Sequence, residues 1–150
     1  MPIAVRRSNV EWTGGLPTGR GVLHAGTSGA LDGLEVTLPS RVDRPDGRTS
    51  PEELLASAHA ACFAMALTGT LEADGTPAQS VDVSAVCTLD RDGDAFTITT
   101  TDLHVSASGV DRAVLADAAQ RAERSCPVSN ALRAGVEIRL HVSSDAPART

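Results

Sequence analysis

The chain has 150 residues, enough for one domain with a sizeable hydrophobic core, but its only aromatic residues are two Phe and one Trp. That core must therefore consist mainly of Val, Leu, Ile and Ala. The formal net charge of -6 gives no basic surface of the kind that binds nucleic acid. The N-terminus has no long apolar run after its arginines, and no stretch is free of polar residues over the length of a membrane span. We therefore expect a soluble cytoplasmic protein without a signal peptide.

The chain is organised around residues 50–71, which we predict to form one helix with Cys62 near its middle. Ser50 suits the N-cap position, and Glu53 three residues later completes the pattern of a capping box. Between residues 54 and 67 the side chains are almost all apolar, and alanines fall on every face of the helix. A helix that is apolar all round is a buried one, so we expect Cys62 to lie at the centre of the molecule.

Alternating apolar residues on either side of this helix predict short strands. The expected strands are residues 3–12, 20–25, 34–38, 81–89, 95–107 and 136–142. We expect a loop over residues 39–49, a hairpin turn at residues 90–93, and a bulge near residues 99–102, where the apolar phase reverses. An amphipathic helix is predicted at residues 111–124, followed by a short helical turn that Ser129 caps. This order of elements predicts an α+β fold with no βαβ repetition.

The central helix also bears on the oligomeric state. One small sheet and one further helix are too little to cover a helix that is apolar on all of its sides. We therefore expect a second copy of the chain to complete the cover, so that the protein is a homodimer.

Three cysteines in a cytoplasmic chain do not make a structural disulfide framework. Cys62 and Cys126 both fall in helical segments, and Cys126 stands at a helix end before Pro127, where we expect it to be exposed. The two are candidates for a reactive thiolate and a resolving thiol, and the alternative for each is an inert buried thiol. Cys87 is in phase with the apolar residues of its strand, so we expect it to belong to the core.

A thiolate within an apolar helix needs a cation nearby, because burial otherwise keeps the thiol protonated. Arg20 and Arg41 lie in segments from which a guanidinium can reach it. Glu52 opens the helix and can orient an arginine, since Glu53 is already accounted for by the capping box. The four histidines show no metal-ligand spacing and there is no CxxC motif, so we expect neither a metal nor another cofactor.

Two segments resemble the motifs of one family. Residues 50–67, SPEELLASAHAACFAMAL, are similar to the N-P-E-E-L…A-A-H-A-x-C-F helix of the OsmC/Ohr family, the osmotically inducible and organic-hydroperoxide-resistance proteins. Residues 125–132, SCPVSNAL, resemble that family's second motif, C-P-V-S-x-x-L. His59 and the Cys-Pro-Val-Ser form favour the OsmC branch. The resemblance implies a single domain over residues 1–150, with antiparallel sheets around two long central helices in an intertwined homodimer.

The resemblance also implies roles for the site residues. Cys62 matches the peroxidatic cysteine, Cys126 the resolving cysteine, and Glu52 the glutamate that holds a catalytic arginine. That arginine is Arg41 on the OsmC pattern and Arg20 on the Ohr pattern. We favour Arg41, because the helix motif is OsmC-like.

The activity that the resemblance implies is that of a thiol-dependent peroxidase, with an external dithiol or thiol reductant as co-substrate. A Cys62 sulfenic acid would form, condense with Cys126 to a disulfide, and be recycled by that reductant. The apolar residues beside Cys62, among them Phe63 and Met65, favour organic hydroperoxides over hydrogen peroxide. The alternative is a module without catalytic activity that binds an apolar ligand or senses redox state.

Overall fold

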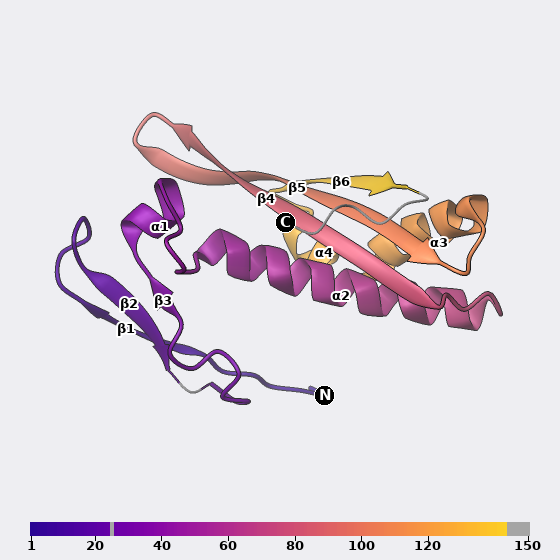
Figure 1. Ribbon diagram of the computed structural model, residues 1–150, viewed down its shortest axis with the longest axis horizontal. Coiled ribbons are helices and arrows are strands. Elements are labelled where there is room, and N and C mark those ends of the chain that lie inside the picture. Colours follow the sequence, from indigo (N-terminus) through magenta and orange to yellow (C-terminus); the bar gives the residue numbers. More distant parts are fainter. Residues whose placement is uncertain (25, 144–150) are drawn as a thin grey trace. The chain divides into compact units, whose positions relative to one another are not determined.

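The computed structural model describes residues 1–24 and 26–143, and it has the α+β fold expected from the order of predicted elements. The strands are β1 (Asn9–Thr13), β2 (Arg20–His24), β3 (Glu35–Val36), β4 (Ser80–Asp92), β5 (Ala95–Ser108) and β6 (Glu137–Val142), shown in Figure 1. The helices are α1 (Leu38–Val42), α2 (Pro51–Ala73), α3 (Arg112–Ser125) and α4 (Pro127–Leu132). The chain divides into two compact units, the first over residues 1–54 and the second from residue 55 onward.

The first unit contains an antiparallel sheet in the order β1–β2–β3, so the predicted meander is confirmed. Asn9 pairs with His24, and the ladder continues along both strands towards the turn that joins them. The first strand begins six residues later than residue 3, where we expected it, and β3 has only two residues. The third strand is shorter than predicted because the chain enters a helix at Leu38.

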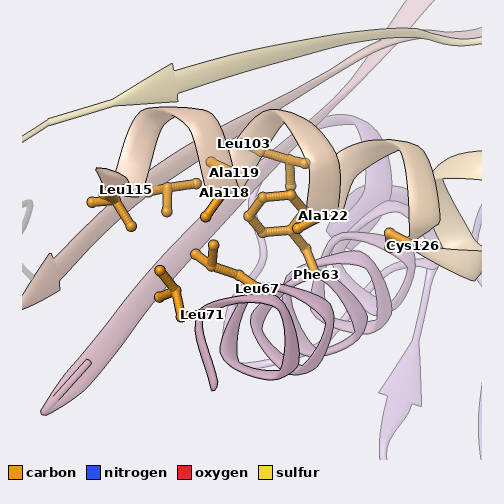
Figure 2. Packing of buried hydrophobic residues seen from close by; sticks show 10 residues of the cluster. Phe63, Leu67, Leu71, Leu103, Leu115, Ala118, Ala119, Ala122 and Cys126 are labelled. Carbon is orange, nitrogen blue, oxygen red and sulfur yellow. The ribbon is translucent and has the colours of Figure 1, made fainter. Parts of the chain in front are cut away.

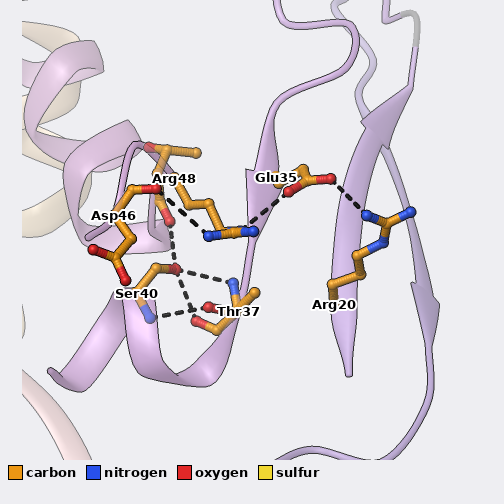
Figure 3. Close-up of polar contacts among 7 residues, drawn as sticks. Arg20, Glu35, Thr37, Ser40, Asp46 and Arg48 are labelled. Carbon is orange, nitrogen blue, oxygen red and sulfur yellow. Dashed lines mark hydrogen bonds and ion pairs between the residues drawn. The ribbon is translucent and has the colours of Figure 1, made fainter. Parts of the chain in front are cut away.

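The predicted loop over residues 39–49 is wrong at its start, where the structure has α1. Thr37 caps this helix: its hydroxyl accepts the N–H of Ser40 at 3.0 Å, and the Ser40 hydroxyl accepts the N–H of Thr37 at 2.9 Å (Figure 3). This reciprocal pair is a capping box in which Ser stands at the position more often held by Glu or Gln. Pro39 suits the first turn, where its missing N–H is not needed. The Ser40 hydroxyl also donates to the carbonyl of Thr49 at 2.9 Å, which ties α1 to the residues just before α2.

The predicted central helix is α2, which extends two residues beyond its expected end. Ser50 caps it by accepting the N–H of Glu53 at 3.1 Å, while the Glu53 carboxylate accepts a hydrogen bond from the hydroxyl of Thr49 at 2.7 Å. By length and composition alone α2 is able to cross a membrane, contrary to our expectation that no stretch is. The core helix of a soluble protein passes the same test, so this property is weak support for a membrane span.

The second unit contains a sheet in the order β4–β5–β6. β4 and β5 form the predicted hairpin, but its two-residue turn is Gly93–Asp94, slightly later than expected; Gly93 has φ 61°, which glycine adopts without strain. Thr88 pairs with Thr100 and Leu89 with Ile98, so Thr99 is an extra residue on β5. This extra residue is the bulge predicted from the reversal of the apolar phase, and that prediction is confirmed.

β6 runs parallel to β5, with Thr100 opposite Glu137 at one end and Val105 opposite Val142 at the other. The antiparallel arrangement implied by the family resemblance is therefore wrong for this one strand, while the single β5–β6 crossover leaves the expected absence of βαβ repetition unchanged. Parallel neighbours need a long crossover connection, and α3 and α4 provide it by returning the chain to the end from which β6 starts.

The hydrophobic core of the second unit lies between α2, α3 and one face of the sheet. Phe63, Leu67 and Leu71 on one face of α2 pack against Leu103 and the alanines of α3 (Figure 2). Full burial of each such Leu or Phe side chain stabilises the fold by about 1.5–3 kcal/mol. The opposite face of α2 is uncovered among the described residues of its own unit, where Met65 is 76% exposed. The expectation that α2 is buried on every side is therefore not met by the single chain.

Candidate active site

The structure brings together two cysteines that are far apart in the sequence. Cys62 lies in the middle of α2, and Cys126 lies at the junction between α3 and α4. The Cys126 side chain lies close enough to Cys62 to interact with its thiol, and both are thiols in this structure. Because this contact lies wholly within the second unit, the fold of that unit alone creates a potential redox pair.

Pro127 determines how Cys126 is placed. A residue before proline is disfavoured in helical conformation, and Cys126 accordingly has φ -68° and ψ 118°, which ends α3 and starts α4. Its N–H donates to the carbonyl of Ala122 at 2.8 Å, and its carbonyl accepts the N–H of Asn130 at 3.0 Å. The Cys126 side chain is fully buried in the core cluster. Our expectation that this cysteine is exposed is therefore wrong, because the side chain points from the helix junction into the core.

Three influences act on the Cys62 thiol. Burial is the largest and raises the pKa, the N–H of Val128 lowers it by donating a hydrogen bond to the sulfur, and the neighbouring Cys126 raises it. The net effect is a raised pKa, so these surroundings favour the protonated thiol. A reactive thiolate at this position therefore needs a positive charge in addition to the Val128 amide.

Arg41 and Glu52 form an ion pair within the first unit. Arg41 lies in the last turn of α1, and its Nε and Nη2 lie 2.8 Å and 2.6 Å from Oε1 of Glu52. The side chains are 31% and 9% exposed, so the contact is largely shielded from water. The charge-assisted hydrogen bond from Nε, with Nη2 in ion-pair contact with the same oxygen, orients the guanidinium.

Arg20, the second candidate for the arginine, has a different partner. Its guanidinium donates to Oε1 of Glu35 at 2.9 Å, while Arg48 donates to Oε2 of the same carboxylate at 3.1 Å (Figure 3). The Arg20 side chain is 61% exposed. The structure thus pairs Glu52 with Arg41 and pairs Arg20 with Glu35.

A buried polar contact that the sequence analysis missed lies close to the two cysteines. Nε2 of His59 on α2 is 2.7 Å from the hydroxyl of Ser129 on α4, and both residues are fully buried. Burial lowers the pKa of His59, and the negative charge of Glu123 opposes that effect only in part, so the ring is neutral. The sequence predicts Ser129 as the cap of the short helix, but Ser129 lies inside α4, and Cys126 holds the N-cap position. The available signal was His59 itself, since a polar residue inside an apolar helix needs a hydrogen-bond partner.

The third cysteine lies on another element, and no metal site accompanies the cysteine pair among the described residues. Cys87 lies on β4, where it is half-buried, so it is less enclosed than the core position we expected. Within residues 1–24 and 26–143, no group of three or more His, Cys, Asp or Glu residues is arranged to hold a metal ion.

Two neighbouring thiols at a helix junction are the arrangement expected of a thiol-based redox protein. Residues 44–141 match the model of the OsmC family, described as OsmC-like protein. The chain belongs to this family, as the two sequence motifs predict.

Known proteins of similar sequence and structure agree with this assignment. The peroxiredoxin OsmC of Escherichia coli K12 is 33% identical over 141 residues, which cover 93% of this chain and 97% of that protein. The organic hydroperoxide resistance protein OsmC of Legionella pneumophila has a TM-score of 0.78 at 25% identity, covering 95% of this chain and 99% of that one. OhrB of Bacillus subtilis has a TM-score of 0.73 at 25% identity, covering 91% and 98%. These similarities confirm the predicted fold and the predicted class of enzyme, a cysteine-based peroxidase.

Proposed function

We propose that this protein reduces organic hydroperoxides, and hydrogen peroxide less well, through a Cys62–Cys126 redox pair. The Cys62 thiolate attacks the terminal oxygen of the hydroperoxide, the O–O bond breaks, and the alkoxide leaves as the alcohol after taking a proton. Cys62 is then a sulfenic acid. The sulfur of Cys126 displaces its oxygen as water and forms a disulfide, which an external dithiol or thiol reduces by exchange. The observation that carries this proposal is the contact between the two thiols across α2 and the α3–α4 junction.

We assign the catalytic guanidinium to Arg41 and its orientation to Glu52. The thiolate needs a positive charge because burial raises the pKa of Cys62. Arg41 makes a hydrogen bond and an ion pair with Glu52, whose side chain is 9% exposed, whereas the Arg20 side chain is 61% exposed and pairs with Glu35. A fixed guanidinium stabilises charge on the sulfur and on the departing oxygen better than a mobile one. No resident cofactor takes part in these steps.

The preference for organic substrates rests on the similar solved structures, since the proteins of Legionella pneumophila and Bacillus subtilis are both named for organic hydroperoxide resistance. Phe63 was expected to form part of an apolar wall around the substrate, but its side chain is fully buried in the core and packs against other core residues (Figure 2).

We further propose that the protein acts as a soluble cytoplasmic homodimer in which the uncovered face of α2 packs on a second copy. Ala58, Ala61, Met65, Thr68 and Glu72 are exposed in the single chain. They recur at alternating spacings of three and four residues, which is the spacing of a stripe that one helix presents to another. A stripe centred on Ala and Met is suited to close packing between helices.

The test is peroxide turnover by Cys62→Ser and Cys126→Ser variants with cumene or tert-butyl hydroperoxide and a dithiol. We expect Cys62→Ser to lose turnover, and Cys126→Ser to oxidise once at Cys62 and then pass to the sulfinic acid. Cys87→Ser is the matched control, which should retain turnover because Cys87 lies on β4 and not on the helices that carry the pair. Full turnover by Cys62→Ser would remove this thiol from the reaction.

The raised pKa of Cys62 also fits the alternative, an apolar-ligand or redox-sensing module in which this thiol is inert. Alkylation at pH 7 separates the two functions. A thiol that a guanidinium ionises reacts fast, and a structural thiol reacts slowly. Slow alkylation of Cys62 that an Arg41→Met substitution does not change would favour the module without catalytic activity.

A further inference from the structure

The buried bond between His59 and Ser129 joins the same two helices as the cysteine pair does. His59 precedes Cys62 by three residues on α2, and Ser129 follows Cys126 by three residues on α4. Residues three apart on a helix lie on the same side of it, one turn away. Two contacts, one between thiols and one between imidazole and hydroxyl, therefore connect α2 and α4 at neighbouring turns.

α4 depends on such contacts for its position. It has six residues, which is too short to be stable as an isolated helix in water. Ser129 is its only fully buried residue, and the hydroxyl of Ser129 bonds to His59. Cys126 is the N-cap of α4, and the amide that bonds to the Cys62 sulfur belongs to Val128 in the first turn of the same helix. Both groups that act on Cys62 thus move with α4.

His59 is suited to hold α4 in one place. The distance of 2.7 Å is that of a good hydrogen bond, and both partners are withdrawn from water, which cannot replace the bond. Nδ1 of His59 is buried without a hydrogen-bond partner among the described residues. The ring therefore makes its polar contact through Nε2 alone, and loss of the Ser129 hydroxyl leaves a buried imidazole with neither nitrogen satisfied.

We propose that His59 and Ser129 are positioning residues that hold the first turn of α4 so that Cys126 stays against Cys62. This inference rests on the proposed function of the two thiols as a redox pair. The step that it governs is disulfide formation. Cys126 loses its proton, its sulfur attacks the sulfur of the Cys62 sulfenic acid, the S–O bond breaks, and the oxygen leaves as water with the proton.

The effect on this step follows from geometry. The two sulfurs must close to about 2.05 Å to form the disulfide, and a misplacement of about 1 Å can lower the rate of such a reaction by roughly a hundredfold. Attack of Cys62 on the peroxide involves a group on α2 and does not require Cys126. The first step depends on α4 only through the Val128 amide, which lowers the pKa of Cys62, whereas the second step needs Cys126 itself in place. Loosening α4 should therefore slow the second step much more than the first.

The decisive variant is Ser129→Ala, which deletes one hydroxyl from α4. In rapid-mixing experiments with cumene hydroperoxide we expect sulfenic acid formation within about twofold of the wild-type rate and disulfide formation slower by roughly tenfold or more. The sulfinic acid of Cys62 should accumulate at lower peroxide doses. Ser129→Thr, which keeps the hydroxyl, should restore disulfide formation, an outcome that a general loss of packing does not predict.

A second variant and a matched control keep the result interpretable. His59→Gln should slow the same step, and combining it with Ser129→Ala should add little, because both substitutions break one contact. Ser106→Ala removes another buried serine hydroxyl, on β5, and should change neither step. Equal rates of disulfide formation in wild type, Ser129→Ala and His59→Gln would overturn the inference, as would faster formation in either variant.

Failure of this inference is distinguishable from failure of the proposed function. If the wild-type protein forms no sulfenic acid with peroxide, the peroxidase proposal falls. The positioning role is then still measured by oxidation with diamide, which forms the Cys62–Cys126 disulfide without peroxide. A slower diamide reaction in Ser129→Ala than in Ser106→Ala supports the positioning role, and equal rates refute it.

Discussion

Replacing Arg41 by Met removes the positive partner of Glu52 and tests the structural reasoning about this pair. Glu52 is 9% exposed and Arg41 is 31% exposed, so the carboxylate depends on its partner more than the guanidinium does. Oε2 of Glu52 is already buried without a hydrogen-bond partner among the described residues. Loss of Arg41 therefore leaves a buried carboxylate without its counter-charge, which costs several kcal/mol in proteins.

The magnitude follows from the exposure of the two groups. Breaking a buried ion pair from one side costs about 3–5 kcal/mol, and the partial exposure of Arg41 puts this case at about 3 kcal/mol. Glu52→Gln should cost only about 1 kcal/mol, because the amide keeps an acceptor oxygen and Arg41 can turn to water. Arg20→Met is the matched control, an Arg–Glu pair whose arginine is 61% exposed, and should cost about 0–1 kcal/mol.

The assay is urea unfolding of the three variants and the wild type, followed by far-ultraviolet circular dichroism. A loss of about 3 kcal/mol lowers the unfolding midpoint by about 1–3 M urea for a protein of this size. Peroxide turnover, measured in parallel, should fall in Arg41→Met and Glu52→Gln and persist in Arg20→Met. The reasoning is refuted if Glu52→Gln destabilises the protein as much as Arg41→Met does, or if Arg20→Met has the largest effect.

Three further predictions follow from individual residues. Burial lowers the pKa of His59. Below about pH 6.5 the unfolded chain therefore binds a proton at this residue that the folded chain does not. His59 thus lowers the free energy of unfolding as the pH falls, by up to about 1.4 kcal/mol per pH unit. Unfolding of the wild type and of His59→Gln at pH 7.5 and 5.5 should therefore show a steeper loss in the wild type, with exposed His24→Gln as the control. Met65→Glu should convert the proposed dimer to a monomer in sedimentation experiments, and an unchanged mass would place the dimer contact elsewhere. Leu67→Ala, in the core, should destabilise the chain by about 2–5 kcal/mol in urea unfolding, and a loss below 1 kcal/mol would contradict the packing around α2.

The periodicity of the sequence was enough to predict the elements that carry their own local signals. α2 has an N-cap at Ser50 and an apolar body, and the bulge at Thr99 shows as a reversal of apolar phase along one strand. α1 was missed because it has only five residues and its capping box ends in Ser40, not in Glu or Gln. A helix of this length contributes too few residues for a periodic pattern.

The long-range pairings could not be predicted from local pattern. The alternation of β6 predicts a strand but not its parallel direction, which depends on the path that α3 and α4 take across the sheet. The residues by themselves leave both Arg20 and Arg41 as candidates for Glu52, and only the resemblance to the family motif favours Arg41. Only the folded first unit pairs Arg41 with that carboxylate.

What the sequence determined by itself was the family, the α+β class, and the two helices that carry the cysteines, because capping, periodicity and motif are properties of neighbouring residues. What only the tertiary structure decided was which side chains meet. Packing of α2 against the α3–α4 junction places Cys62 against Cys126 and His59 against Ser129, and these contacts join residues about 64–70 positions apart. Local sequence does not specify such contacts, because they arise only when a shared hydrophobic core forces distant helices into one arrangement.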